Sequence, residues 1–558
     1  MLVDLNGTTS SGTTGSPIAD DAKGCVVGQI FGCNNINGTP KGDVMVHVYA
    51  TQSLNKADIS TKPDKNTNTY DVTAVYGGGN QAAYEPAGGK ETTNSTNVII
   101  DGCGLTSIQT VYGGGNAAST PATNVIVNGT YEIEELFGGG NGKDKLPDGR
   151  PNPGANVGYK NYTVYTKDGD DWVASDAPAY DTKEERTAPG SAIVYGSGQA
   201  SVNVFGGTVH RVFGGSNTKG NVRQTAVTLL EELEGEDCCP FHVDEAYGGG
   251  KSASMDAEAK LLMACIPGLE EVYGGAQAAD IRDDVTLTIT NGTFNRVFGG
   301  NNISGTISGS ITLNIEEVGC RPIIIGELYG GGNLAAYSIY GYNDDNTPKT
   351  SGENPSRDPE VNVKSFTSIG SIYGGGYGEG ALMVGSPTVN INEVTDPLSE
   401  AQNRSYKVPD PDFPDDPAKA TTHYYSDYPG ETKTIAGHDV ILPSHEKGKM
   451  GSINTVFGGG NAAEVRGNTT VNIGTTTGED IYMAVPVAVG TDLTDGGYYT
   501  RSGNEYTAAT GDAEEDTTYY KKYTVIGVDI RDNVYGGGNN AEVTGNTNVN
   551  IGKREKDE

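Results

Sequence analysis

One run of adjacent acidic residues could take part in general acid–base chemistry. Asp283 and Asp284 follow Arg282, and His210 and His438 are candidate helpers elsewhere in the chain. Paired carboxylates cleave glycosidic bonds in many polysaccharide-degrading enzymes, which makes such an enzyme the second hypothesis for this chain. Neighbouring residues of a strand point to opposite faces, however, so these two carboxylates would not converge on one substrate atom.

A near-copy of this run weakens the catalytic hypothesis further. The segment 280–285 reads DIRDDV, and the segment 529–534 reads DIRDNV, so the second copy lacks one of the two carboxylates. A recurring string is more typical of a structural repeat than of a single active site. We therefore expect a protein without catalytic activity, and we assign no catalytic residue.

Metal and cofactor chemistry have little support in the residue pattern. The six histidines show no HxxxH or HxH spacing, so a zinc site is not indicated. The glycine-rich strings are not followed by a helix, which argues against a dinucleotide site. Two acidic loops could bind Ca²⁺ through their carboxylate oxygens, although solvated loops are the simpler interpretation. One loop contains Asp168, Asp170 and Asp171, and the other contains Asp410, Asp412, Asp415 and Asp416. We expect no cofactor, with calcium as the open alternative.

The cysteines give no clear disulfide framework. Seven of them occur, an odd number without CxxC spacing: Cys25, Cys33, Cys103, Cys238, Cys239, Cys265 and Cys320. The sequence therefore predicts buried free thiols that pack as small apolar residues.

Charge and hydropathy exclude two classes of partner. The chain carries 38 Lys and Arg against 72 Asp and Glu, a formal net charge of −34. Nucleic-acid binding needs clustered basic residues, so we expect no nucleic-acid partner. No apolar run reaches the length that a transmembrane helix needs, so we expect no membrane span.

A glycine-rich repeat dominates the rest of the chain. An apolar residue, an aromatic residue and two or three glycines recur together, with the aromatic at Phe31, Tyr76, Tyr112, Phe137, Tyr195, Phe213, Tyr247, Tyr273, Phe298, Tyr329, Tyr373, Phe457 and Tyr535. Six copies carry the full string GGGN, ending at Asn80 (after Gly77, Gly78 and Gly79), Asn116, Asn141, Asn333, Asn461 and Asn539. The copies 457–474 and 535–552 are identical at 14 of 18 positions.

The repeat predicts a β-solenoid. Segments such as 285–289 (VTLTI) alternate apolar and polar residues, which is typical of strands with one buried face, and Asn-Gly or Gly turns follow them. A unit of about 25 residues is too thin to enclose a core, so successive units must stack. We expect the glycines to allow positive φ and close backbone approach at a corner, and each Asn to hydrogen-bond to its equivalent one coil away.

We therefore expect an all-β parallel solenoid of about 13 coils with inserted hairpins. Coils are predicted over 1–141, 191–392, 451–473 and 531–558, with a short helix near 254–266 and a loop at 337–360. The related segments 142–190 and 474–530 are predicted to form inserted hairpin modules, and 393–450 a Pro-, Asp- and Tyr-rich insertion. Open solenoid ends would expose unpaired strand edges, through which the chain could self-associate.

The inserted segments hold aromatic residues outside the repeat. Candidate ligand contacts are Tyr162, Tyr165, Trp172, Tyr424, Tyr425, Tyr499 and Tyr506. Exposed aromatic rings beside acids and amides suit sugar stacking or protein contacts, but the same rings could simply pack the small hairpins.

The recurring VYGGGNxA…GxTxVxI units resemble the Gly-rich repeats of large secreted or surface proteins of gut Bacteroidetes. The resemblance covers most of the chain outside the insertions and brings no catalytic residues with it. It implies an adhesin-like, right-handed parallel β-helix at the cell surface or outside the cell, although the chain begins without a secretory signal. We expect a non-catalytic protein that binds a glycan or a protein partner through its inserted loops.

Overall fold

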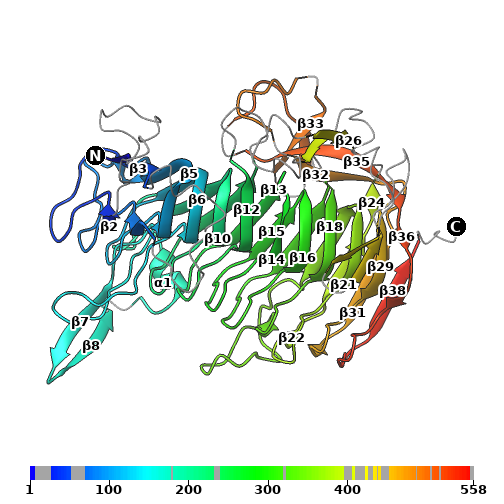
Figure 1. The fold of residues 1–558 in the computed structure, drawn as a ribbon. Helices are drawn as coiled ribbons and strands as arrows, with labels where there is room; N and C mark the ends of the chain where they lie inside the picture. Colours follow the sequence, from blue (N-terminus) through cyan, green and yellow to red (C-terminus); the bar gives the residue numbers. More distant parts are fainter. Residues whose placement is uncertain are drawn as a thin grey trace. The chain divides into compact units, whose positions relative to one another are not determined.

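The computed structural model describes residues 1–6, 27–51, 70–176, 180–231, 239–317, 322–394, 405–408, 421–424, 432–435, 438–441, 451–485, 487–494, 496–502, 505–514 and 517–552. Strands make up most of the regular structure, and the large sheet is parallel (Figure 1). The predicted all-β parallel solenoid is therefore confirmed. The chain divides into two compact units, one of residues 1–261, 273–286 and 301–309, the other of residues 262–272, 287–300 and 310–558.

The first unit consists of stacked coils with one inserted hairpin. Its strands are β1 (Leu2–Asn6), β2 (Val27–Phe31), β3 (Val44–Ala50), β4 (Val72–Tyr76), β5 (Thr96–Tyr112), β6 (Thr123–Phe137), β7 (Thr163–Asp168), β8 (Asp171–Asp176), β9 (Gln199–Val204), β10 (Gly207–Phe213), β11 (Gln224–Leu230) and β12 (Phe241–Tyr247). Strands β6, β10 and β12 pair in parallel, which aligns Phe137, Phe213 and Tyr247 at equivalent positions. Isolated parallel bridges link Thr120, Val157 and Val222 and add a third strand-like side to these coils.

The second unit repeats this arrangement. Its coil strands are β16 (Gly292–Phe298), β17 (Ile311–Glu316), β18 (Ile323–Tyr329), β19 (Tyr337–Ser338), β20 (Glu360–Ser365), β21 (Ser368–Tyr373), β22 (Met383–Val384), β23 (Thr388–Ile391), β29 (Ser452–Phe457), β30 (Val465–Arg466), β31 (Thr469–Ile473), β36 (Asp529–Ile530), β37 (Val534–Tyr535) and β38 (Thr547–Ile551). Strands β13 (Ala259–Ala264), β14 (Gly268–Tyr273) and β15 (Val285–Ile289) contain residues of both units. The short strands β19, β22 and β30 form the third side of the coils.

Antiparallel elements occupy the insertions. Strands β7 and β8 form a hairpin around Gly169, which has a φ of 61°. Strands β24 (Glu393–Val394), β32 (Asp480–Val485), β33 (Tyr498–Ser502), β34 (Glu505–Ala508) and β35 (Tyr519–Gly527) form a five-stranded sheet. Two further hairpins are β25 (Ser405–Val408) with β26 (Thr421–Tyr424), and β27 (Thr432–Ile435) with β28 (His438–Ile441). The Pro-rich run 409–417, Tyr425, Cys25, Cys238, Cys320 and the charged tail 553–558 lie outside the described residues.

The repeated aromatic residues form a stack in each unit. In the first unit the rings of Phe31, Tyr76, Tyr112, Phe137, Phe213, Tyr247 and Tyr273 follow one another with centroids 4.6–5.0 Å apart. In the second unit the rings of Phe298, Tyr329, Tyr373, Phe457 and Tyr535 are 4.8–4.9 Å apart. These distances match the spacing of neighbouring strands, so each coil contributes one ring.

Tyr195 is not a member of this stack, contrary to the sequence prediction. The ring of Phe137 stacks directly on that of Phe213, with centroids 4.8 Å apart. Tyr195 instead follows Val194, which forms an antiparallel bridge with Tyr159. The reason lies in the motif, because Gly196 and Gly198 after Tyr195 are separated by Ser197 and cannot form the close-packed corner of the other copies.

The GGGN glycines let the backbones of successive coils approach closely, but they do not adopt positive φ. None of them before Asn80, Asn116 or Asn141 has a positive φ. A Cβ atom at Gly113 would lie 2.4 Å from the carbonyl oxygen of Gly138 in the next coil. The expectation of positive φ at these corners was therefore wrong, whereas the expectation of close backbone approach is confirmed.

The Asn residues form the expected ladder. Asn116 donates to the Asn80 side chain at 2.9 Å, and Asn141 donates to Asn116 at 2.9 Å. Asn539 likewise donates to Asn461 at 3.2 Å in the second unit. The amide nitrogen of Asn141 also donates to the Tyr76 hydroxyl two coils away, at 3.2 Å, which links the amide ladder to the ring stack.

The helix predicted near 254–266 was wrong. Strand β13 occupies residues 259–264, and Ala259, Leu261 and Met263 are buried while Lys260 is exposed. This period of two lets the segment bury alternate side chains, and packing overrides the helix propensity of its Ala, Lys, Leu and Met residues. The described helices are the 3₁₀ helix η3 (Lys90–Thr92) and α1 (Lys183–Thr187).

The prediction of free thiols was wrong for three of the described cysteines and holds for Cys33. Cys103 and Cys239 form a disulfide across 136 residues, with their Cα atoms 5.6 Å apart, and Cys265 is also disulfide-bonded. Cys33 is a free, buried thiol. The disulfide could not be predicted from spacing, because stacking alone brings residues of distant coils together.

Candidate functional site

The predicted acidic pair lies in the turn before β15, where its polar atoms already have partners. The Asp283 carboxylate forms an ion pair with Lys183 of α1 at 2.5 Å and accepts a hydrogen bond from the Asp284 backbone N–H at 2.9 Å. Arg282 donates to Asp256 at 3.2 Å and so points to a different partner. The structure does not bring Arg282, Asp283 and Asp284 together around a common space.

Asp256 is the centre of a buried ionic network in the first unit. Arg186 of α1 donates two hydrogen bonds to the Asp256 carboxylate, of 2.6 and 2.9 Å, and the Asn221 side chain donates a third at 2.8 Å. Burial alone would raise the pKa of Asp256, but the hydrogen bonds and charge of Arg186 outweigh it and hold this pKa below its usual range. The network ties the inserted helix to the coils, which is a structural role.

The sequence carried a signal for α1 that the repeat pattern obscured. Thr182 accepts from the backbone N–H of Glu185, whose carboxylate accepts in turn from the backbone N–H of Thr182. This is the capping box that Ser or Thr followed three residues later by Glu indicates. The short helix it starts positions Lys183 and Arg186 for their ion pairs.

His210, a predicted helper, lies in a different cluster on β10. Its ring nitrogens pair with Asp244 at 2.6 Å and Glu132 at 2.9 Å. Hydrogen bonds from Asp244 and then Glu132 raise the pKa of His210 to about 9, and the same imidazole, with His242, holds the pKa of Asp244 far below its usual range. The imidazole is therefore protonated at neutral pH and cannot act there as a general base.

Further charged residues extend this cluster along the same strands. Arg211 pairs with Glu134 at 2.7 Å and Glu135 at 3.1 Å, and Lys251 also reaches Glu135. We call Glu132, Glu134, Glu135, His210, Arg211 and Asp244 the β10 charged cluster. Its members come from three strands that are distant in sequence, β6, β10 and β12, and the stacking of coils brings these strands together. His438, the other predicted helper, is the first residue of β28.

The inserted sheet of the second unit holds a cluster of tyrosines. The rings of Tyr482 and Tyr506 stack with centroids 4.0 Å apart, and Tyr499 and Tyr520 meet them edge-on at 5.0 and 5.1 Å. We call these four residues the insertion tyrosine cluster. All four are half-buried, so the rings pack the sheet and still present part of their surface to solvent. Two of them, Tyr499 and Tyr506, were predicted as ligand contacts.

The other predicted aromatic contacts are distributed over the first insertion and β26. Tyr162 packs edge-on against Tyr180 at 5.7 Å, and the Tyr165 hydroxyl accepts from Lys219 at 2.8 Å. Trp172 lies on β8 opposite Lys167 and is half-buried. Tyr424 ends β26.

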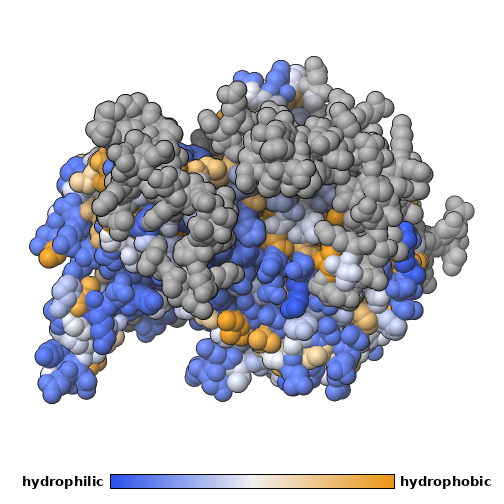
Figure 2. Space-filling view, viewed as in Figure 1, coloured by the Kyte–Doolittle hydropathy of each residue, from blue (hydrophilic) through white to orange (hydrophobic). Residues whose placement is uncertain are grey.

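Hydrophilic residues predominate on the surface seen in Figure 2. Among the described residues, no group of three or more His, Cys, Asp or Glu is arranged to hold a metal ion. Within the described parts of the chain, no helix is long and apolar enough to cross a membrane. Comparisons with protein-family models, with curated proteins and with solved structures found no match to this chain.

Proposed function

We propose that this chain is a non-catalytic, adhesin-like repeat protein of the cell surface or the extracellular space, which binds a glycan or a protein through its inserted segments. The observation that carries the proposal is the insertion tyrosine cluster. Its rings are held in fixed orientations by one another and remain half-exposed on a small antiparallel sheet. Rigid aromatic rings of this kind bind sugar faces or protein side chains at low entropic cost.

Two further observations support this function. The carboxylate of Asp283, a candidate under the second hypothesis only, forms an ion pair with Lys183 and accepts a hydrogen bond from a backbone N–H, so it is engaged within the fold. The disulfide between Cys103 and Cys239 suits an oxidising compartment, such as the outside of a cell, where such bonds form and persist.

Binding of the intact chain to glycan and protein arrays tests the proposal. We expect Tyr499→Ala and Tyr506→Ala to weaken the binding of any retained ligand roughly tenfold, equivalent to about 1.4 kcal/mol. Thr507→Ala, an exposed change on the same hairpin, is the matched control and is expected to bind normally. Unaltered binding by both tyrosine variants would remove the insertion tyrosine cluster from the function.

A polysaccharide-degrading enzyme is the second candidate, because two half-buried carboxylates, of Glu132 and Asp244, flank the imidazole of His210. Incubation with polysaccharides, with and without EDTA, separates the two functions. New reducing or unsaturated ends that disappear in Glu132→Gln would establish the enzyme. Binding without product release would support the adhesin-like protein.

A further inference from the structure

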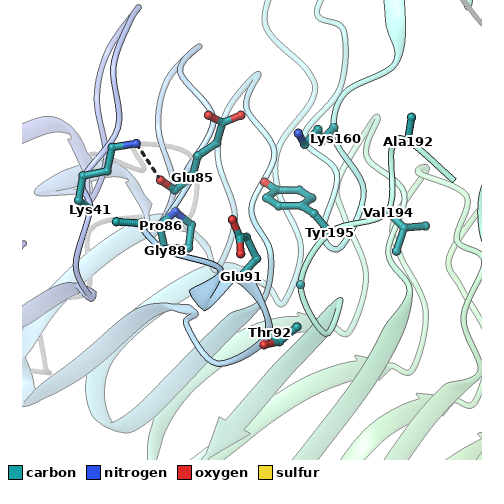
Figure 3. A pocket seen from close by; sticks show the side chains of 12 residues that line it. Lys41, Glu85, Pro86, Gly88, Glu91, Thr92, Lys160, Ala192, Val194 and Tyr195 are labelled. Atoms are coloured by element: carbon teal, nitrogen blue, oxygen red, sulfur yellow. Dashed lines mark hydrogen bonds between the residues drawn. The ribbon is translucent and has the colours of Figure 1, made fainter. Parts of the chain in front are cut away.

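A cavity of about 790 Å³ lies in the first unit, and its lining includes none of the insertion tyrosines (Figure 3). Its walls include two ammonium groups, of Lys41 and Lys160, and two carboxylates, of Glu85 and Glu91. Tyr195 and Pro86, both largely buried, form part of its lining. The volume falls within the range of roughly 300–1,000 Å³ that is usual for small-molecule sites.

Hydrogen bonds of the backbone fix the walls of this cavity. The Lys160 backbone N–H donates to Ile193 at 2.7 Å, and that of Tyr195 donates to Gly158 at 3.0 Å. On the opposite wall, the Glu85 backbone N–H donates to the Thr39 hydroxyl at 2.7 Å, and Lys41 Nζ reaches the Glu85 carbonyl at 3.3 Å. Four segments of the chain, at residues 41, 85–92, 160 and 192–196, therefore build one preformed cavity.

The four charged side chains form no ion pairs with one another. Neither lysine forms an ion pair with another described residue, and neither do Glu85 and Glu91. The Lys160 ammonium stands 6.0 Å from the centre of the Tyr195 ring, and Lys41 has only a carbonyl partner. The cavity thus has two ammonium and two carboxylate groups around an aromatic ring, with no net charge from these four groups.

We propose that this cavity binds a neutral oligosaccharide. A sugar hydroxyl both donates and accepts, so it can satisfy an ammonium and a carboxylate at once. A phosphate or a carboxylate ligand would gain from Lys41 and Lys160 but lose to Glu85 and Glu91, so these four groups give it no net attraction. The apolar face of a sugar ring would lie against Tyr195 and Pro86. The proposal rests on the proposed function only in taking a glycan as ligand, because the cavity uses none of the insertion tyrosines.

Isothermal titration of the full chain with neutral gluco-, manno-, galacto- and xylo-oligosaccharides tests this site, and oligogalacturonate and an acidic peptide serve as charged probes. We expect Glu91→Gln and Lys160→Met each to weaken the binding of a neutral oligosaccharide roughly tenfold. Lys167→Met, an exposed change on β7, is the matched control and is expected to bind within about twofold of the unaltered chain. Thermal unfolding of each variant checks that the first unit is intact.

Hydrogen exchange supplies a second readout that depends on no substitution. The bound sugar is expected to protect amides in segments 85–92 and 192–196. Failure of every neutral oligosaccharide to bind, preference for oligogalacturonate, or binding that survives both substitutions would overturn the proposal. Binding that is lost in Tyr499→Ala but kept in Glu91→Gln and Lys160→Met would overturn this site and leave the proposed function in place.

Discussion

Single residues in the repeat differ in how well they suit the backbone of their coil. Ala462 follows the GGGN of its coil and has a φ of 59°, in the left-handed region, while Asn540 occupies the equivalent position of the next repeat with a φ of 55°. Asn tolerates this conformation better than Ala does, because its side chain can hydrogen-bond locally. Ala462 is therefore a point of strain that the neighbouring repeat avoids.

We expect Ala462→Asn to raise the free energy of unfolding of the second unit by about 0.5–1 kcal/mol. Urea denaturation measures the change. The matched control is Thr470→Asn, which also converts a residue to its counterpart in the next repeat, Asn548, but at a strand position without positive φ. The control is expected to be neutral or slightly destabilising, and equal effects of the two substitutions would contradict the role of strain.

The pairing of His210 makes the stability of the first unit depend on pH. Its pKa is raised from the usual 6.5 to about 9, so its contribution is complete below about pH 6.5 and is lost as the pH rises through about 9. Asp244 has a lowered pKa, so its contribution is present above its usual 3.8 and is lost as the pH falls towards its lower, folded-state value. The carboxylates of Glu132 and Glu134 also face the imidazole and favour its charged form.

We expect His210→Gln to cost about 1–2 kcal/mol near pH 5.5, a value reduced for partial exposure, and progressively less between about pH 6.5 and 9.5. Chemical denaturation at several pH values checks this. His242→Gln, at a side chain that is 60% exposed, is the control and should show a smaller cost at each pH. A cost for His210→Gln that grows with pH would contradict the assigned pairing.

The packing of one coil on the next depends on the glycines of the repeat, because the backbones of successive corners are in contact. Gly459 and Gly537 are the middle glycines of two adjacent, nearly identical repeats. A Cβ atom at Gly459 would lie 2.8 Å from the backbone nitrogen of Gly538, whereas one at Gly537 would meet nothing within 4 Å.

We expect Gly459→Ala to lower the free energy of unfolding of the second unit by about 1–3 kcal/mol, and Gly537→Ala to change this free energy by less than about 0.5 kcal/mol. Thermal unfolding of the two variants measures this difference, and equal costs would mean that the glycines are kept for backbone freedom.

The elements that the sequence predicted are those whose signal is local and repeated. Alternating residues such as 285–289 identify strands, and the recurring aromatic and Asn positions predict their own stacking, because each coil places them at the same point. The helix prediction for residues 254–266 was wrong, because helix propensity contributes less to stability than the burial of alternate side chains in β13. Sites built across coils, such as the β10 charged cluster, leave no local trace. His210 meets partners 34 and 78 residues away in sequence, and no spacing rule relates them.

At the scale of the whole molecule, most contacts of a solenoid join neighbouring coils. A disulfide differs from these contacts because it also restricts the unfolded chain. The Cys103–Cys239 disulfide connects residues 136 positions apart in the first unit. Such a link restricts the unfolded chain strongly, and its removal commonly costs about 2–4 kcal/mol. Like the disulfide of Cys265, it depends directly on the redox state of the surroundings.

We expect the double variant Cys103→Ser and Cys239→Ser to unfold at a lower temperature than the unaltered chain, by an amount equivalent to about 2–4 kcal/mol. Cys33 provides the internal control, because burial raises the pKa of its thiol to about 12 and keeps it unreactive in the folded chain. Alkylation followed by peptide mass spectrometry should therefore show Cys103 linked to Cys239, and Cys33 modified only after unfolding. Chain produced under reducing conditions should lose the linked peptide and be no more stable than the double variant, because reduction also breaks the disulfide of Cys265. If the reduced chain is as stable as the oxidised one, the disulfide is not a stabilising element, and its support for placement outside the cell is lost.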